Sequence, residues 1–213
     1  ATIQPQSQHA VEYLIHTLTQ AEAPITLATL GPLTNIALAL IQQPQVAENI
    51  HEIVAMGGAV THGNVTPSAE FNIYVDPHAA EVVFSAGIPT TLITLDTTHQ
   101  VLTTAARLQM IRGLGNPVAA AAADLLAHYG HLDADRYGMV GSPLHDPCVI
   151  AYLMQPTLFT RRQVPVAVEV DDRPTQGRTV VDWWHRNAGP MQVVDSVDVP
   201  GFYTLLTQQL GTY

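Results

Sequence analysis

The sequence predicts an α/β fold, with an open, mainly parallel (mixed) sheet flanked by helices. Short runs of apolar and β-branched residues alternate with segments of helical periodicity. The first runs are apolar almost throughout, which is typical of parallel strands that are buried on both faces. Each run ends at glycine or at polar residues, where open α/β sheets bind their ligands. These runs lie at residues 24–30, 51–56 and 89–95.

The segments between and after these runs carry helix signals. Val11 and Leu18 lie two helical turns apart in an amphipathic segment. Asp76 and Pro77 are typical of a helix start, and Gly87 is typical of a helix end. We expect helices at residues 8–20, 31–42, 76–84, 102–113, 117–130, 145–154 and 201–210.

The C-terminal part changes character. "PVAVEV", "TVVDWW" and "MQVVDSV" read as further strands, and antiparallel pairing is one option for them. Nothing in the sequence resembles a repeat or a long linker. We therefore expect residues 1–213 to form a single domain.

Composition excludes several classes of function. Charged residues make up only 12% of the 213, the formal net charge is −10, and the eight Lys and Arg positions, all of them arginine, are scattered, so we expect no nucleic acid partner. No apolar run has the length of a membrane span, so we expect no membrane partner. The single cysteine, Cys148, permits no internal disulfide and no thiolate metal cage, which favours a reducing compartment such as the cytoplasm. The N-terminus has neither the basic start nor the apolar stretch of a signal peptide, and it lacks an initiator Met, which suggests a processed or truncated chain.

The loop after the second strand gathers hydrogen-bonding side chains. "NVTPSAEFNIYVDP", residues 64–77, carries Asn64, Glu70 and Asn72. Amides both donate and accept, and a carboxylate accepts strongly from hydroxyl groups, so these three could hold a small polyol. The alternative is a solvated loop whose polar side chains cap local turns.

A second candidate is "GSPLHDPCVIAYL", in which His145 and Asp146 stand together at a helix start. The histidine could protonate a leaving group, and the aspartate could bind a cation or a diol. The alternative for Asp146 is a helix cap, because Asp-Pro is common at helix starts.

A turn and two tyrosines are further candidates, and each also has a purely structural interpretation. The turn at Leu30 and Gly31 could present a backbone carbonyl to an ion, or could be an ordinary tight turn. Tyr129 and Tyr137 could stack on a flat heterocycle, or could be surface tyrosines at a helix end.

Taken together, three segments resemble the inosine–uridine preferring nucleoside hydrolase family. They are "GPLTNIALAL", "MGGAVTHGNVTPSAEFNIYVDPHAA" and "SPLHDPCVIAYL", and they occur in the family's order and spacing. The similarity runs from about Pro24 to the C-terminus. "RYGMVGSPLHDPC" and "TQGRTVVDWW" look most like the bacterial pyrimidine-preferring ribonucleoside hydrolases. The resemblance implies the nucleoside hydrolase fold and calcium-assisted hydrolysis of a small-molecule ribonucleoside to ribose and free base.

The resemblance also implies roles for the loop side chains. Asn64 and Glu70 would hold the 5′ side of the ribose. Asn72 would bind the region of the 2′ and 3′ hydroxyls and stabilise an oxocarbenium-like transition state, which makes it a catalytic candidate. Met56 would pack against the ribose.

The remaining roles concern the leaving base and the metal. His145 would be the acid toward the base, and Tyr137 and Tyr129 fall where residues contact the base. Asp146 and the backbone carbonyl of Leu30 match calcium ligands. The resemblance further implies a homo-oligomer, either a dimer or a tetramer.

One family feature has no match in this sequence. The family's N-terminal strand carries an aspartate-rich "DxDPGxDD"-type motif, which supplies most calcium carboxylates and the base that activates water. We therefore expect the chain to correspond to the C-terminal two-thirds of a nucleoside hydrolase domain, with the N-terminal strands missing and the Ca²⁺ site incomplete. Three alternatives stay open for the chain: a nucleoside hydrolase fragment that is inactive without a separate N-terminal fragment, a non-catalytic nucleoside or ribose binder, and a structural remnant that folds only with a partner segment.

Overall fold

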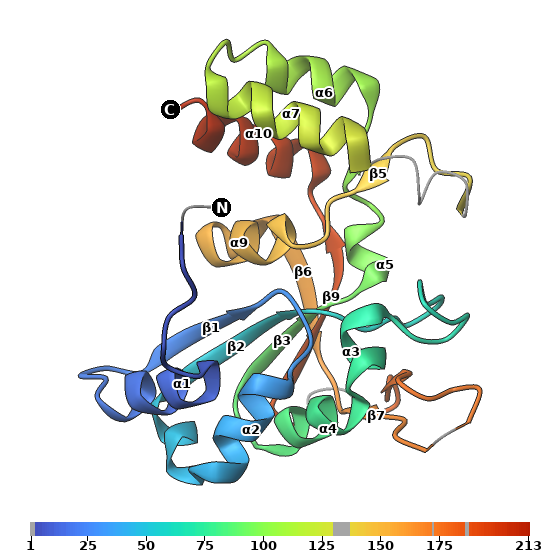
Figure 1. The fold of residues 1–213 in the computed structure, drawn as a ribbon. Helices are drawn as coiled ribbons and strands as arrows, with labels where there is room; N and C mark the ends of the chain where they lie inside the picture. The colour runs from blue at the N-terminus through green and yellow to red at the C-terminus, as the bar shows by residue number, and fades with distance from the viewer. Residues whose placement is uncertain (1–2, 130–136, 172, 186–187) are drawn as a thin grey trace.

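The protein is built around one mixed sheet, which the computed structural model places at its centre (Figure 1). The structure describes residues 3–129, 137–171, 173–185 and 188–213. The sheet has five strands in the order β1-β2-β3-β9-β6. They are β1 (Ile25–Thr29), β2 (Ile50–Met56), β3 (Thr90–Ile93), β9 (Met191–Val197) and β6 (Phe159–Gln163). This arrangement confirms the predicted fold class.

The first three strands run parallel in the order of the sequence, and β9 joins β3 in parallel. Only β6 runs antiparallel, along the outer side of β9. Of the expected C-terminal strands, β7 (Val166–Val168) and β8 (Thr179–Val181) pair antiparallel in a separate two-stranded sheet. The antiparallel option thus holds for β7 and β8, whereas β9 belongs to the parallel core.

Helices cover both faces of the sheet (Figure 1). The longer ones are α1 (Ala10–Thr19), α2 (Thr34–Gln42), α4 (Pro77–Ser85), α6 (Ala105–Arg112), α7 (Pro117–Tyr129), α9 (Pro147–Met154) and α10 (Val199–Leu210). The shorter ones are α3 (Phe71–Val75), α5 (Leu95–Thr98) and the 3-10 turns η1 (Pro44–Asn49) and η2 (Pro156–Leu158). The seven helices expected from the sequence are all present, with boundaries shifted by a few residues.

The apolar side chains divide into cores on the two faces. Helices α1, α2 and α4 pack on one face, where Ile53, Leu92 and Val193 come from the sheet. Helices α9 and α10 pack on the other, against Val54 and Ile93 among others. Because neighbouring residues of β2 and β3 serve opposite faces, these two strands are largely buried, as expected of parallel core strands. Strand β1 differs from the expectation, since it lies at the sheet edge and none of its residues is buried. Helices α6, α7 and α10 form a third, smaller cluster above the sheet (Figure 1).

The structure departs from the expected elements where the chain turns at the ends of strands. Strand β3 ends at Ile93 rather than at residue 95, because the Leu95 N–H bonds to the carbonyl of Gly58 and α5 begins there. Residues 102–103 form a short strand, β4 (Leu102–Thr103), with β5 (Ser142–Pro143), instead of opening helix α6. Within the described part of the chain, no helix is both long enough and apolar enough to cross a membrane.

Candidate active site

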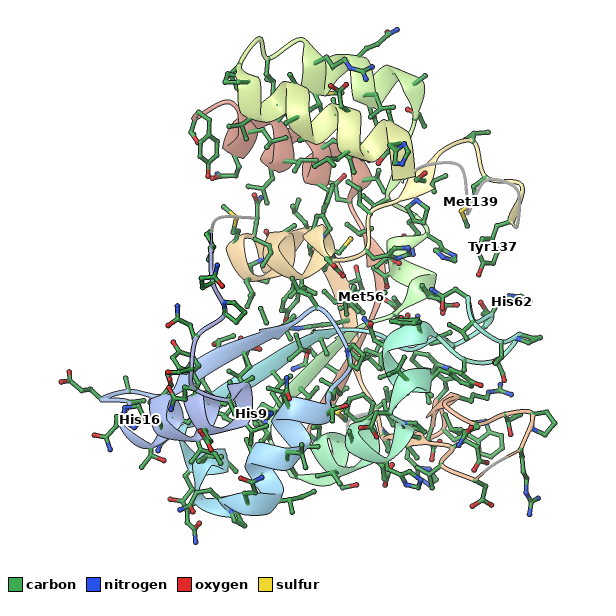
Figure 2. The ribbon with its side chains drawn as sticks, in the orientation of Figure 1. His9, His16, Met56, His62, Tyr137 and Met139 are labelled. Atoms are coloured by element: carbon green, nitrogen blue, oxygen red, sulfur yellow. The ribbon has the colours of Figure 1, made fainter. Side chains whose placement is uncertain are left out.

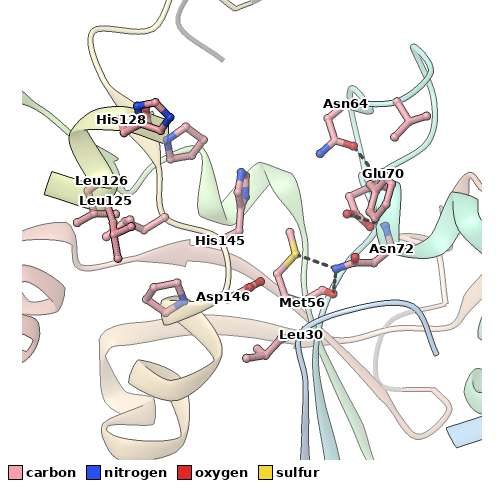
Figure 3. A pocket seen from close by; sticks show the side chains of 16 residues that line it. Leu30, Met56, Asn64, Glu70, Asn72, Leu125, Leu126, His128, His145 and Asp146 are labelled. Carbon is pink, nitrogen blue, oxygen red and sulfur yellow. Dashed lines mark hydrogen bonds between the residues drawn. The ribbon is translucent and has the colours of Figure 1, made fainter. Parts of the chain in front are cut away.

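A cavity of about 730 Å³ lies at the carboxyl ends of the parallel strands (Figure 3). Leu30 follows β1, and Met56 ends β2. The loop after β2 and helix α3 form one wall, the segment before α9 forms the middle, and the end of α7 forms the opposite wall. Seven of the nine residues singled out from the sequence line this cavity: Leu30, Met56, Asn64, Glu70, Asn72, His145 and Asp146.

The loop between β2 and α3 is fixed by its own backbone geometry. Gly58 has a φ of +75°, which only glycine adopts readily. A Cβ at Gly63 would lie 2.2 Å from the carbonyl oxygen of Ala69, so no larger residue fits the turn. The hydroxyl of Tyr137 donates to the Gly63 carbonyl at 2.8 Å. Tyr137 thus lies over the loop that carries His62 (Figure 2).

Glu70 is an internal support of this loop. Its carboxylate accepts from the N–H groups of Gly58 at 2.9 Å, Asn72 at 2.9 Å and Ile73 at 3.3 Å, and it caps α3. The side chain is only 2% exposed. Burial raises the pKa of Glu70, and the three N–H groups act against that rise. The turn-capping alternative therefore applies to Glu70, although its carboxylate also borders the cavity.

We expect Glu70→Ala to lower the free energy of unfolding by roughly 2–4 kcal/mol, because it leaves three backbone N–H groups without their acceptor. Urea denaturation measures the change. Asp198→Ala is the matched control, since Asp198 caps α10 through the Gly201 N–H at an exposed position, and removing such a cap costs about 0.5–1 kcal/mol. An equal loss in both variants contradicts the role of Glu70 as the loop's support.

The two asparagines are held in different ways. The Nδ2 of Asn72 donates to the carbonyl of Met56 at 3.1 Å and lies 3.5 Å from the Met56 sulfur. Asn72 is 8% exposed, so its amide is both buried and oriented (Figure 3). The Oδ1 of Asn64 accepts from the Phe71 N–H at 2.9 Å. Both amides thus meet the cavity on the wall formed by the loop and α3.

His145 stands between the two walls of the cavity (Figure 3). Its Nδ1 lies 2.8 Å from the hydroxyl of Thr98, a residue of α5 that is wholly buried. The ring centroid of His99 lies 5.8 Å from that of His145 and 5.0 Å from that of Tyr137. Tyr137 is thereby linked to the cavity through His99. Tyr129 ends α7, and its side chain lies outside the described residues.

Asp146 occupies the N-cap position of α9, but its side chain makes no capping hydrogen bond. By contrast, Asp76 caps α4 through the Ala79 N–H at 3.0 Å and accepts from the Thr34 hydroxyl at 2.7 Å. Partial burial raises the pKa of Asp146, so its environment disfavours the charged form. Because the side chain makes no capping hydrogen bond, the capping alternative is wrong for Asp146, which borders the cavity and is exposed.

The donor set around Asp146 is small. Ca²⁺ takes six to eight oxygen ligands. Within the described residues, no group of three or more His, Cys, Asp or Glu side chains could hold a metal ion. Asp146 and the backbone of Leu30 both border the cavity, but one carboxylate and one carbonyl do not make a calcium shell. These residues alone therefore do not fit the ion that the resemblance implies.

Several lining residues were not singled out from the sequence. Phe71 and Val65 border the cavity beside the asparagines, and Leu125 and Leu126 form the opposite apolar wall. The helical pattern of residues 117–130 predicted α7 but gave no sign that its end reaches the site. Phe71 follows Glu70 directly, so its place beside the loop candidates was the one available signal.

Comparison with known proteins assigns the class. An α/β protein with a cavity at the ends of its parallel strands has the architecture of many enzymes. The family model described as inosine-uridine preferring nucleoside hydrolase matches residues 1–204, and the chain belongs to this family.

Two relatives and two solved structures support the same assignment. The chain is 47% identical to the pyrimidine-specific ribonucleoside hydrolase RihA of Shewanella woodyi and 45% identical to that of Salmonella typhimurium. Each alignment covers 98% of this chain and 68% of the relative. Among solved structures, a purine-preferring ribonucleoside hydrolase from Gardnerella vaginalis matches with a TM-score of 0.89 at 34% identity. A plant nucleoside hydrolase matches with a TM-score of 0.91 at 29% identity. Each covers 100% of this chain, which in turn spans 68% and 70% of the two structures.

Proposed function

We propose that the cavity binds a ribonucleoside and that its residues take part in hydrolysis of the N-glycosidic bond, giving ribose and free base. The observation that carries the proposal is the placement of two amides and one imidazole on a single cavity: Asn64 and Asn72 on one wall and His145 facing them (Figure 3). The ribose lies against the asparagines and Met56, and the base lies toward His145 and Tyr137.

The chemistry of each wall supports this orientation. An amide offers both a donor and an acceptor, so the two asparagines can hold several hydroxyl groups of one sugar. Bond cleavage leaves positive charge on the ribose, and an oriented amide oxygen stabilises such charge without reorganisation. Asn72 is suited to this because Met56 already fixes its Nδ2. Glu70 supports the wall and offers its remaining acceptor capacity to the 5′ side of the sugar.

His145 acts on the leaving base. As the bond between C1′ and the base nitrogen breaks, its electron pair passes to the nitrogen. A protonated imidazole supplies the proton that the base then needs. Water adds to C1′ and loses one proton, so that overall one water is consumed and the imidazole can be protonated again. Tyr137, whose ring contacts His99 beside His145, is proposed to contact the base. Tyr129 is proposed as a base contact on the resemblance alone.

The base that we propose is a pyrimidine. The relatives that share 45–47% of their residues with this chain are named pyrimidine-specific, whereas the purine-preferring structure shares 34%. Turnover of uridine and cytidine against inosine tests the preference, with release of free base as the readout. Faster cleavage of inosine than of both pyrimidine nucleosides refutes it. If the 213-residue chain is inactive alone, these assays use the chain completed by the part of the Shewanella woodyi relative that it does not match.

We propose calcium as the metal only because the sequence resembles the nucleoside hydrolase family. We propose Asp146 and the backbone carbonyl of Leu30 as two of its ligands, with the other oxygens supplied from elsewhere. We expect the 213-residue chain alone to bind Ca²⁺ no more tightly than millimolar, since it offers few oxygens, and to hydrolyse nucleosides far below an enzymatic rate. Calorimetry on mass-verified material measures the binding. Micromolar affinity accompanied by turnover contradicts the expectation and means that other residues complete the shell.

A second candidate function is nucleoside or ribose binding without catalysis. The small donor set around Asp146 favours it, because the asparagine wall does not depend on a metal. Uridine that binds to the completed chain in the presence of Ca²⁺ but is recovered intact supports this candidate over the hydrolase.

Three broader expectations also remain proposals. We propose that residues 1–213 fold as one domain, that copies associate as a dimer or tetramer, and that the protein acts in the cytoplasm. Light scattering coupled to size-exclusion chromatography tests the association. A monomer at all concentrations refutes it.

A further inference from the structure

The ring of His145 contacts α5, a short helix that the sequence did not predict. Helix α5 places Thr98 so that its hydroxyl lies 2.8 Å from Nδ1 of His145. Thr98 is 0% exposed, so water does not compete for this contact. A buried hydroxyl in contact with the nitrogen of a half-buried ring is oriented, since a buried hydroxyl left without its partner is costly.

A second contact of the Thr98 hydroxyl favours one direction for this hydrogen bond. The Thr98 hydroxyl also lies 3.4 Å from the Leu95 carbonyl, which can only accept. When Thr98 donates its single proton to Leu95, its oxygen accepts from Nδ1–H of His145. The neutral ring then carries its proton on Nδ1. The two nitrogens of an imidazole point apart, so Nε2 is directed away from Thr98, and the ring borders the cavity.

We infer that Thr98 is a positioning residue, whose hydroxyl holds the His145 ring with a proton on Nδ1 and its Nε2 toward the leaving base. The inference rests on the proposed function for its catalytic meaning. In the reaction, Nε2–H of the imidazolium passes its proton to the base nitrogen, which receives the electron pair of the broken bond. The ring is left neutral, with Nδ1–H still donated to Thr98.

The rest of α5 is built to hold this position. The Thr97 hydroxyl donates to the Val194 carbonyl of β9 at 2.7 Å, which ties the helix to the sheet. The Asp96 carboxylate accepts from the Val60 N–H at 2.7 Å and from the Thr61 hydroxyl at 2.6 Å. The same helix therefore fixes both the imidazole and the start of the loop that carries the asparagines.

The first test measures which ring nitrogen of His145 carries the proton. Nitrogen NMR of the 213-residue chain, in alkaline buffer in which imidazoles are neutral, distinguishes the two tautomers of His145. The wild-type ring is expected to be protonated on Nδ1. Thr98→Val is expected to lose this preference, and Thr98→Ser to keep it. Thr90→Val is the matched control, because it removes a buried hydroxyl that donates to the Ile88 carbonyl, away from His145. If the His145 ring of the wild-type protein is protonated on Nε2, the inference is overturned, even when no variant folds. If Thr98→Val folds and His145 keeps the wild-type tautomer, the inference is also overturned.

The second test reads the consequence for catalysis. In an active form of the protein, Thr98→Val is expected to slow uridine hydrolysis by roughly 3- to 10-fold, with Thr98→Ser close to wild type. A nitrophenyl riboside, which leaves without a proton, is expected to react at an unchanged rate. Equal slowing of both substrates overturns the inference. If wild type does not cleave nucleosides but the tautomer shifts as expected, the proposed function fails and the positioning of His145 by Thr98 stands.

Discussion

Replacing His145 with alanine is expected to lower kcat for uridine by about 10²–10⁴ while leaving hydrolysis of a nitrophenyl riboside nearly unchanged. A general acid helps in proportion to the leaving group's need for a proton. Uracil leaves poorly as an anion, whereas nitrophenolate leaves without protonation. The ratio of the two rates in an active form of the protein therefore isolates proton donation from binding.

His128→Ala is the matched control, because His128 lines the same cavity from the end of α7 and has no assigned part in the reaction. We expect both of its rates to stay close to wild type. Equal losses on uridine and nitrophenyl riboside in His145→Ala would falsify the acid role and leave His145 as a binding or structural residue.

Asn72→Ala is expected to lower kcat by about 10²–10³, with a smaller effect on KM. Asn72 is 8% exposed and is held by the Met56 carbonyl at 3.1 Å, so its amide is oriented before substrate arrives. An interaction that strengthens as charge develops on the ribose acts mainly on the transition state. Steady-state kinetics with uridine measures both constants.

Asn64→Ala provides the comparison for this prediction. Asn64 lies on the same wall, but its Oδ1 already accepts from the Phe71 N–H, and the residue is more exposed. We expect its loss to act mainly on KM. If Asn72→Ala likewise changes only KM, Asn72 contributes uniform binding, and its role in the transition state must be withdrawn.

The sequence predicted the parallel core because periodicity reports burial. Strands β2 and β3 are short, largely apolar runs that are packed between helices. Strand β1 was expected to be buried as well, but it lies at the sheet edge and has no buried residue. Strand β6 was missed because it lies at the sheet edge, where four of its five residues are exposed and give no apolar pattern. Helices α3 and α5 were missed because helices of four or five residues are too short to show a period.

The sequence predicted which residues line the candidate site better than it predicted what each of them does. The rule that ligands bind at the carboxyl ends of parallel strands brought the loop after β2 and the start of α9 together correctly. Spacing alone could not show that the Glu70 carboxylate accepts hydrogen bonds from three backbone N–H groups, or that Asp146 does not cap α9. Thr98 had no signal at all, because its contact with His145 joins residues that are distant in the sequence.

The most direct test of the central claim is product analysis after incubation of an active form of the protein with cytidine in phosphate buffer and Ca²⁺. Hydrolysis of the N-glycosidic bond gives cytosine and free ribose in equal amounts, and we expect these as the products. Ribose 1-phosphate would show that phosphate attacks C1′ in place of water, and uridine would show that the base is deaminated instead of released. Either product, or cytidine recovered intact, contradicts the assignment of this cavity as a nucleoside hydrolase site.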